Sequence, residues 1–136
     1  MKTGMKILFL DANILFSVAY RENSKLGLLW TLEKTELMTS FYALEEARRN
    51  LKLPDQHARL EFYATQLKIV SHDLLVLLPQ DLILKDKDRP ILSAAIQVKA
   101  DFLLTGDFQD FGRYFGTVIQ GVMILPPAEF LKNFST

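Results

Sequence analysis

The sequence contains no cysteine and only two histidines, so it has few of the residues that most zinc sites and disulfide-rich folds require. Without cysteine there can be neither a disulfide framework nor a thiolate metal site, and His57 and His72 are too few to form a usual zinc site. A chain without disulfides suits a reducing compartment, and we expect the protein to work in the cytoplasm. Any metal site must therefore be built from oxygen ligands.

An excess of one charge sign is also missing. Lysine plus arginine and aspartate plus glutamate each total 16, so the net charge is zero. Nucleic-acid-binding domains often carry a strong positive field, and this chain has no such overall field. If the protein binds nucleic acid, the contacts must come from a local patch.

Long apolar segments are absent as well. The first twenty residues are basic and then apolar, as in a signal peptide, but Asp11 and Asn13 interrupt the apolar part and no small-residue cleavage site stands out. We therefore expect this segment to belong to the mature, folded protein. No segment has the length and hydrophobicity of a membrane span.

Short apolar segments alternate with segments of helical spacing along the chain. The length of 136 residues and the hydrophobic content of 49% are those of one globular domain, which we expect to span residues 1–136. Strands are expected at residues 7–10, 36–39, 74–78, 100–105 and 118–125. One helix is expected to begin at about residue 14, and another to run from after Ser24 to residue 32. Further helices are expected at residues 41–53 (with Ser40 as N-cap), 55–70, 91–99 and 128–134. This alternation predicts an α/β fold with a parallel sheet of four to five strands and helices on both faces.

Asp11 directly follows the first expected strand. Residues 7–10 are too continuously apolar for a half-exposed strand, which fits a strand covered on both faces of a parallel sheet. In open α/β sheets, ligands bind outside the carboxyl ends of the strands, where Asp11 would lie. On this segment alone, a helix N-cap role for Asp11 or Asn13 is the simpler interpretation.

Four acids lie near predicted strand ends or in the first turns of predicted helices: Asp11, Glu46, Asp88 and Asp107. Right-handed crossovers bring the carboxyl ends of parallel strands to one edge, where these acids could meet. Carboxylates packed together repel one another, so such a site needs cations. Oxygen-only ligands favour Mg²⁺ or Mn²⁺. Taken singly, Asp88 could simply start a helix and Asp107 could simply form a turn.

Four sequence segments carry a more specific pattern: LDANIL, TSFYALEEARRNL, KDRPILSAAIQVKADFLLTGD and ILPPAEFL. The third segment is the most distinctive. In it an acid opens an alanine-rich helix, and after that helix come Ala-Asp, an apolar strand and Thr-Gly-Asp. Over nearly its whole length the chain resembles the PIN-domain family of metal-dependent ribonucleases, which includes the VapC-type toxins of toxin–antitoxin systems. The resemblance implies a single PIN-like domain.

The resemblance also implies a set of site residues. By it, the catalytic and metal-binding acids would be Asp11, Glu46, Asp88 and Asp107, with Asn13 and Thr105 supporting them. The sequence departs from the family pattern after Asp107, where the next acid is displaced in the run Asp-Phe-Gln-Asp-Phe. A ligand role for Asp110 therefore stays open.

Helix geometry distinguishes Glu46 from its neighbour Glu45. The apolar stripe of the predicted helix is formed by Leu44, Ala47 and Leu51. At about 100° per residue, Glu46 lies near the edge of this stripe, whereas Glu45 points away and could pair with Arg49 one turn later. We therefore expect Glu46 to be the ligand and Glu45 to be solvated.

The functional hypothesis is an endoribonuclease that cleaves single-stranded RNA with Mg²⁺ or Mn²⁺, the metal activating water for in-line attack on the phosphodiester. Candidate phosphate-binding residues are Arg48, Arg49, Lys87, Arg89 and Arg113. As a VapC-type toxin, the protein would form a homodimer and bind a cognate antitoxin. The alternative is a catalytically inactive PIN-like module that binds RNA or protein. Such a module is expected to have lost acids, and all four are present.

Other notable residues are expected to be structural. Asp101 precedes an apolar strand and is interpreted as a loop acid, and the two histidines as surface or hydrogen-bonded side chains. The aromatic cluster after the fourth strand could stack on bases, but packing in the core is the expected role of Phe108, Phe111, Tyr114 and Phe115.

Overall fold

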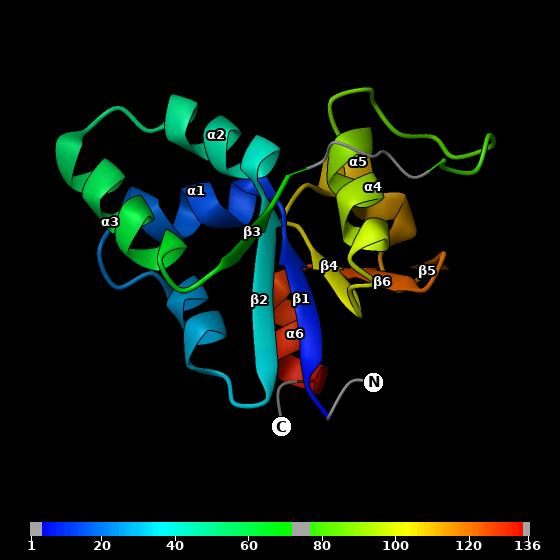
Figure 1. The fold of residues 1–136 in the computed structure, drawn as a ribbon, viewed down its shortest axis with the longest axis horizontal. Helices are drawn as coiled ribbons and strands as arrows, with labels where there is room; N and C mark the ends of the chain where they lie inside the picture. The colour runs from blue at the N-terminus through cyan, green and yellow to red at the C-terminus, as the bar shows by residue number, and fades with distance from the viewer. Residues whose placement is uncertain (1–3, 72–76, 135–136) are drawn as a thin grey trace.

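The computed structural model describes residues 4–71 and 77–134, which form an α/β fold around one open sheet (Figure 1). Within these residues the strand order is β3-β2-β1-β4-β6-β5. The strands are β1 Lys6–Leu10, β2 Thr35–Ser40, β3 Lys68–Val70, β4 Phe102–Leu104, β5 Val118–Ile119 and β6 Val122–Leu125. All neighbouring pairs are parallel except β5 with β6, which forms an antiparallel edge. The predicted fold class is confirmed.

Helices connect the strands. They are α1 Ala12–Tyr20, η1 Lys25–Thr31, α2 Phe41–Asn50, α3 Pro54–Ala64, α4 Arg89–Gln97, α5 Phe108–Phe111, η2 Gly112–Tyr114 and α6 Pro127–Phe134, where η marks a 3₁₀ helix. Ser40 caps α2 as predicted, because its hydroxyl oxygen accepts a hydrogen bond from the Ala43 amide at 3.1 Å. None of the described helices is both long and apolar enough to cross a membrane.

Both faces of the sheet are covered. Successive strand residues point to opposite faces, and Leu8, Phe9 and Leu10 of β1 are all fully buried. Figure 1 shows α6 behind β1 and β2, and the Phe130 ring of α6 lies 5.0 Å from that of Phe102 in β4. The Lys6 ammonium also donates to a carbonyl at the end of α6, at 2.7 Å. The prediction of helices on both faces therefore holds.

The third strand lies earlier than the sequence pattern predicts. Residues 68–70 were expected to end a helix, but α3 ends at Ala64 and residues 68–70 form β3. These three residues pair in parallel with the free edge of β2, with Lys68 opposite Met38. A three-residue edge strand has too few positions to show an alternating pattern, so its identity depends on the partner strand. Of the strand predicted at residues 74–78, residues 74–76 lie outside the described residues, and Leu77 and Leu78 are not in a strand.

The last predicted strand is divided into a hairpin, which is why the described sheet has six strands rather than four or five. Gln120 and Gly121, between β5 and β6, have φ values of 47° and 91°. Two consecutive residues in the left-handed region form the kind of tight turn that reverses a strand. Gly121, which lies within the single strand predicted from the sequence, is therefore part of the turn between two strands.

Candidate functional site

Asp11 lies at the carboxyl end of β1 and begins α1. Its side chain is buried, and its Oδ1 accepts a hydrogen bond from the Ala12 amide at 2.6 Å, so the carboxylate caps the helix. Its second oxygen, Oδ2, accepts hydrogen bonds from the Thr105 hydroxyl at 2.8 Å and the Asn13 amide at 3.1 Å. Burial raises the pKa of Asp11 to about 6, because these hydrogen bonds offset only part of the lost hydration. The cap and strand-end interpretations are therefore both correct for this residue.

Asn13 and Thr105 join the ends of β1 and β4. The Asn13 amide nitrogen donates to Thr105 Oγ1 at 3.1 Å, and Asn13 Oδ1 accepts from the Gly106 amide at 2.8 Å. Thr105 is fully buried, and its oxygen also accepts from the Asp107 amide at 3.1 Å. This network fixes the orientation of the Asp11 carboxylate and the start of the loop that carries Asp107.

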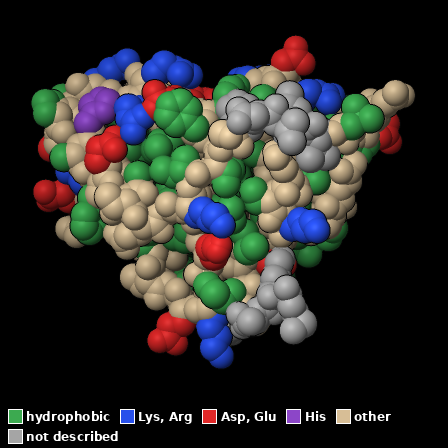
Figure 2. All heavy atoms as spheres, in the orientation of Figure 1, with side chains coloured by type: hydrophobic (Ala, Val, Ile, Leu, Met, Phe, Trp, Pro, Cys, Tyr) green, Lys and Arg blue, Asp and Glu red, His purple; other side chains and the backbone are tan. Residues whose placement is uncertain are grey.

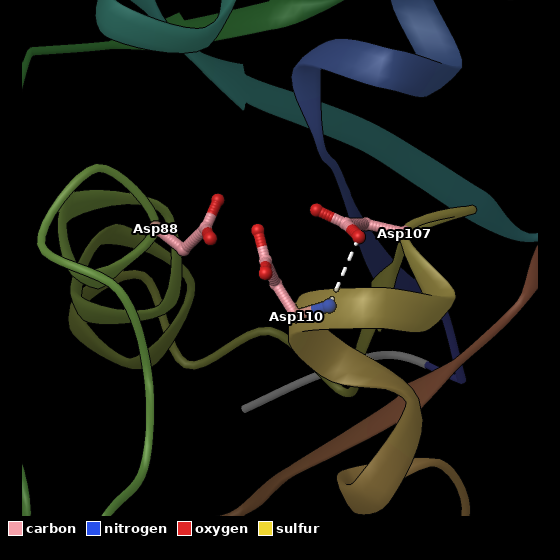
Figure 3. Close-up of side chains that lie close together, drawn as sticks. All are labelled: Asp88, Asp107 and Asp110. Carbon is pink, nitrogen blue, oxygen red and sulfur yellow. Dashed lines mark hydrogen bonds between the residues drawn. The ribbon is translucent and has the colours of Figure 1, made fainter.

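Asp88, Asp107 and Asp110 form a cluster in which one carboxylate oxygen from each residue lies within 4.8 Å of the others. Figure 3 shows the three carboxyl groups directed toward one another, Asp88 from the start of α4, Asp107 from the residue before α5 and Asp110 from α5 itself. Asp107 caps α5 by accepting a hydrogen bond from the Asp110 amide at 3.0 Å. Asp88 makes no such cap, and its buried Oδ2 has no hydrogen-bond partner among the described residues.

Asp88 and Asp110 differ in how readily they lose a proton. Burial raises the pKa of Asp88 to about 7, and the adjacent Asp110 carboxylate adds to the effect. The same contact lowers the pKa of Asp110, because a protonated Asp88 can donate to it. Asp110 also lies 3.1 Å from the Lys85 ammonium and 3.6 Å from that of Lys87, which further favours its ionised form. At neutral pH the two acids therefore behave as a pair that holds up to one proton.

A cavity of about 480 Å³ lies beside this cluster. All four predicted acids line it: Asp11, Glu46, Asp88 and Asp107. Asn13 and Lys87 line it too, so one cation faces the carboxylates. Segments far apart in the sequence thus contribute acids to one hollow at the carboxyl edge of the sheet.

Glu46 and Glu45 differ as the helix geometry predicts. Glu46 lines the cavity, whereas Glu45 forms an ion pair with Arg48, whose guanidinium also bonds Glu61 at 2.8 Å. The expected pairing of Glu45 with Arg49 is wrong, because the side chain reaches the residue three positions along the helix rather than four. The predicted apolar stripe is buried, which confirms the helix phase.

Two residues at this cluster were not assigned a role from the sequence: the acid Asp110 and the neighbouring cation Lys85. Asp110 lies beside Asp88 and Asp107 because α5 places it one turn after its cap residue. The displaced acid in the sequence was the only signal for it. Lys85, which contacts Asp110, has no motif at all.

Of the predicted phosphate-binding residues, Lys87 lines the cavity. Arg48 is engaged by glutamates, and Arg89 donates to the Leu82 carbonyl oxygen at 3.1 Å. Figure 2 shows acidic and basic side chains interspersed over one face of the molecule, in keeping with totals of 16 each. Of the predicted phosphate-binding residues, Lys87 is therefore the one that this geometry places beside the acids.

The remaining expectations divide. Asp101 is structural as predicted, since its carboxylate accepts a hydrogen bond from the Ile7 amide at 2.8 Å. His57 lies 2.8 Å from the Leu51 carbonyl oxygen, and His72 lies outside the described residues. Phe111 is fully buried, but Phe108 is 70% exposed, so the expectation that it belongs to the core is wrong. The short helix α5 turns Phe111 inward and leaves Phe108 on its outer side.

The donor set fits a hard divalent cation. The cavity presents carboxylates without sulfur or imidazole, which is the ligand chemistry of Mg²⁺ and Mn²⁺. The buried, unpartnered oxygen of Asp88 would cost free energy unless it is protonated or bound to a cation. The cluster of three acids can therefore hold a metal ion.

Comparisons with known proteins bear on the family and the fold. The family model described as PIN domain matches residues 7–109. Among solved structures, a chain of VapBC2 from Rickettsia felis, crystallised bound to a DNA fragment from their promoter, is similar with a TM-score of 0.62 and 18% identity. The similarity covers 88% of this chain and 98% of that chain, and at this identity it concerns the fold alone. A comparison with curated proteins gives no match.

Proposed function

Because this chain belongs to the PIN-domain family, we propose that it is a metal-dependent endoribonuclease that cleaves single-stranded RNA. The observation that carries the proposal is the cavity at the carboxyl edge of the sheet, lined by Asp11, Glu46, Asp88 and Asp107. These acids come from four separate parts of the chain. Asp11 and Asp107 also cap helices, but capping does not account for Glu46, which lies within α2 and lines the same hollow.

We propose that these four acids hold Mg²⁺ or Mn²⁺. Such an ion supplies an activated water and neutralises charge on the phosphodiester during in-line attack. Asn13 and Thr105 support the site by holding Asp11 in one orientation. Lys87 would contact a phosphate oxygen of the substrate, because its side chain is 56% exposed and lines the same cavity.

The partner we propose is a cognate antitoxin, as in VapC-type toxins. One solved structure similar to this chain comes from a VapBC2 complex, which supports a paired protein of this kind. The antitoxin would place a basic side chain against the acids and so block the substrate. We also propose a homodimer that acts in the cytoplasm, as one domain over residues 1–136.

The direct test is cleavage of a panel of oligonucleotides: single-stranded RNA, double-stranded RNA and single-stranded DNA. With Mn²⁺ or Mg²⁺ we expect the single-stranded RNA to be cut and EDTA to stop the reaction. Product ends and rates are read on denaturing gels. If no RNA is cut with either metal while RNA or an antitoxin still binds, the catalytically inactive module is the correct interpretation.

Thermal unfolding of Asp88→Asn provides a test that needs no substrate. The pKa of Asp88 is about 7 in the folded protein and about 3.9 in an unfolded chain. Between these values the folded protein retains a proton that the unfolded chain has lost, so stability falls as the pH rises from about 4 to 7. We therefore expect metal-free wild type to melt lower at pH 8 than at pH 5, and Asp88→Asn to melt higher than wild type at pH 8.

With metal bound, the wild type should melt higher than Asp88→Asn, which reverses the metal-free order at pH 8. At a hundredfold excess over Kd, Mn²⁺ should stabilise the wild type by about 2.7 kcal/mol and Asp88→Asn by less. Asp86→Asn, an exposed acid two residues earlier, is the matched control and should melt and respond as the wild type does. A variant at residue 88 that melts lower than wild type in EDTA at pH 8, and gains as much from Mn²⁺, would show that Asp88 is a structural residue.

A further inference from the structure

A second hollow adjoins the acidic cavity. It has a volume of about 690 Å³ and follows the end of α1 and the turn after it. Phe16 lines both hollows, so the two adjoin at this side chain. We call the second hollow the Tyr20 groove, defined by Phe16, Tyr20, Arg21 and Lys25.

The Tyr20 ring is an exposed aromatic surface that packs beside Phe16 at the end of α1. Tyr20 is 55% exposed, and its ring centroid lies 5.3 Å from that of Phe16 with only 31° between the planes. Its carbonyl oxygen accepts hydrogen bonds from the Gln56 amide at 3.1 Å and the Arg59 guanidinium at 3.2 Å. Both donors belong to α3, and Gln56 is buried. The end of α1 is therefore anchored while one side of the ring stays open to solvent.

The groove carries a local positive charge. Arg21 and Lys25 are exposed and line it, against one acid, Glu22. No ion pair joins either cation to another residue in the described part of the chain. The acidic cavity has the opposite balance, so a ligand that spans both hollows meets carboxylates first and then cations.

We propose that single-stranded RNA leaving the acidic cavity passes over Phe16 into the Tyr20 groove, where one base stacks on the Tyr20 ring and flanking phosphates contact Arg21 and Lys25. This inference rests on the proposed ribonuclease function, which places the scissile bond in the acidic cavity. An exposed ring with neighbouring cations is the arrangement that binds unpaired bases without reading their sequence. Bases of a duplex are already stacked on one another, so this groove selects single strands.

The test is binding of a fluorescein-labelled single-stranded RNA of about 16 nucleotides, measured by fluorescence anisotropy with Mn²⁺ present. All proteins carry Asp11→Asn so that the RNA stays intact. Tyr20→Ala and Tyr20→Leu should weaken binding about fivefold or more, whereas Tyr20→Phe should bind as the parent does, because stacking needs the ring and not the hydroxyl. The Leu variant keeps an apolar side chain of moderate size, which separates loss of stacking from loss of packing.

Two further variants complete the test. Phe62→Ala removes a ring that is 63% exposed on α3 and does not line the groove, so binding should be unchanged. Replacing Arg21 and Lys25 together by Gln should reduce the slope of log K against log salt by about 1.4, as expected for two lost phosphate contacts to a single strand. In the Asp11-containing protein the same double variant should raise KM and leave kcat unchanged.

The inference is overturned if Tyr20→Leu binds RNA as tightly as the parent, or if Phe62→Ala weakens binding equally. It is also overturned if Tyr20→Ala keeps RNA binding and loses only an antitoxin peptide, since the groove would then hold protein. Failure of the proposed function looks different. In that case the Asp11-containing protein cuts no RNA, although binding still depends on the Tyr20 ring.

Discussion

Asp11→Asn protein is expected to cleave RNA at least about a hundredfold more slowly than the wild type and to bind RNA with similar affinity. The amide keeps the size of the carboxylate but removes the charge that would attract a metal ion. Asparagine is also as good a helix N-cap as aspartate, so the bond from the Ala12 amide can be retained. Single-turnover cleavage and anisotropy binding measure the two effects separately.

Folding should change little in this variant, because two effects oppose each other. Removing a buried charge is favourable, since burial raises the pKa of Asp11 to about 6. The amide nitrogen, however, cannot accept the hydrogen bonds that Asn13 and Thr105 donate to the present carboxylate. Asp101→Asn is the matched control, because Asp101 also lies at a strand end but bonds the Ile7 amide instead. Cleavage by Asp11→Asn at close to the wild-type rate would remove this residue from the site.

Glu46→Gln should likewise reduce cleavage at least about a hundredfold, whereas Glu45→Gln should cleave at close to the wild-type rate. The two residues are neighbours on α2 and carry the same charge, so this pair controls for both helix stability and net charge. Glu46 lines the acidic cavity, and Glu45 points to the surface, where it pairs with Arg48. A partly exposed ion pair of this kind contributes about 0 to 1 kcal/mol to stability. A difference in cleavage rate between the two variants therefore reports which of the two side-chain positions on α2 takes part in the reaction.

Rates with saturating Mn²⁺ and with limiting Mn²⁺ should be measured for both variants. If Glu46 binds the metal, part of the loss in Glu46→Gln should be recovered at high Mn²⁺, since a weakened site is filled by mass action. If Glu45→Gln is the inactive variant and Glu46→Gln cleaves normally, the side chain that lines the cavity has no role in the reaction.

The parts of this protein that depend on local residue patterns could be predicted from the sequence. The apolar run of residues 7–10, the Ser40 cap and the apolar stripe of α2 each act within a few residues, so they could be predicted without knowing the rest of the chain. The stripe alone placed Glu46 near its edge and Glu45 away from it. The alternation of strands and helices then indicated that acids at strand ends would lie at one edge.

The strand that fills the edge beside β2 and the acids that complete the cluster are known only from the folded structure. Residues 68–70 become a strand because β2 offers unpaired backbone groups there, and nothing in three residues alone specifies this. Asp110 joins Asp88 because one turn of helix begins at the Asp107 cap, and the two chain segments meet only after the sheet has formed. The adjacency of the acidic cavity and the Tyr20 groove likewise depends on helix packing, since the Tyr20 carbonyl oxygen is held by donors on α3 that lie more than thirty positions away. Contacts of this kind are set by the packing of distant segments, which local residue patterns do not encode.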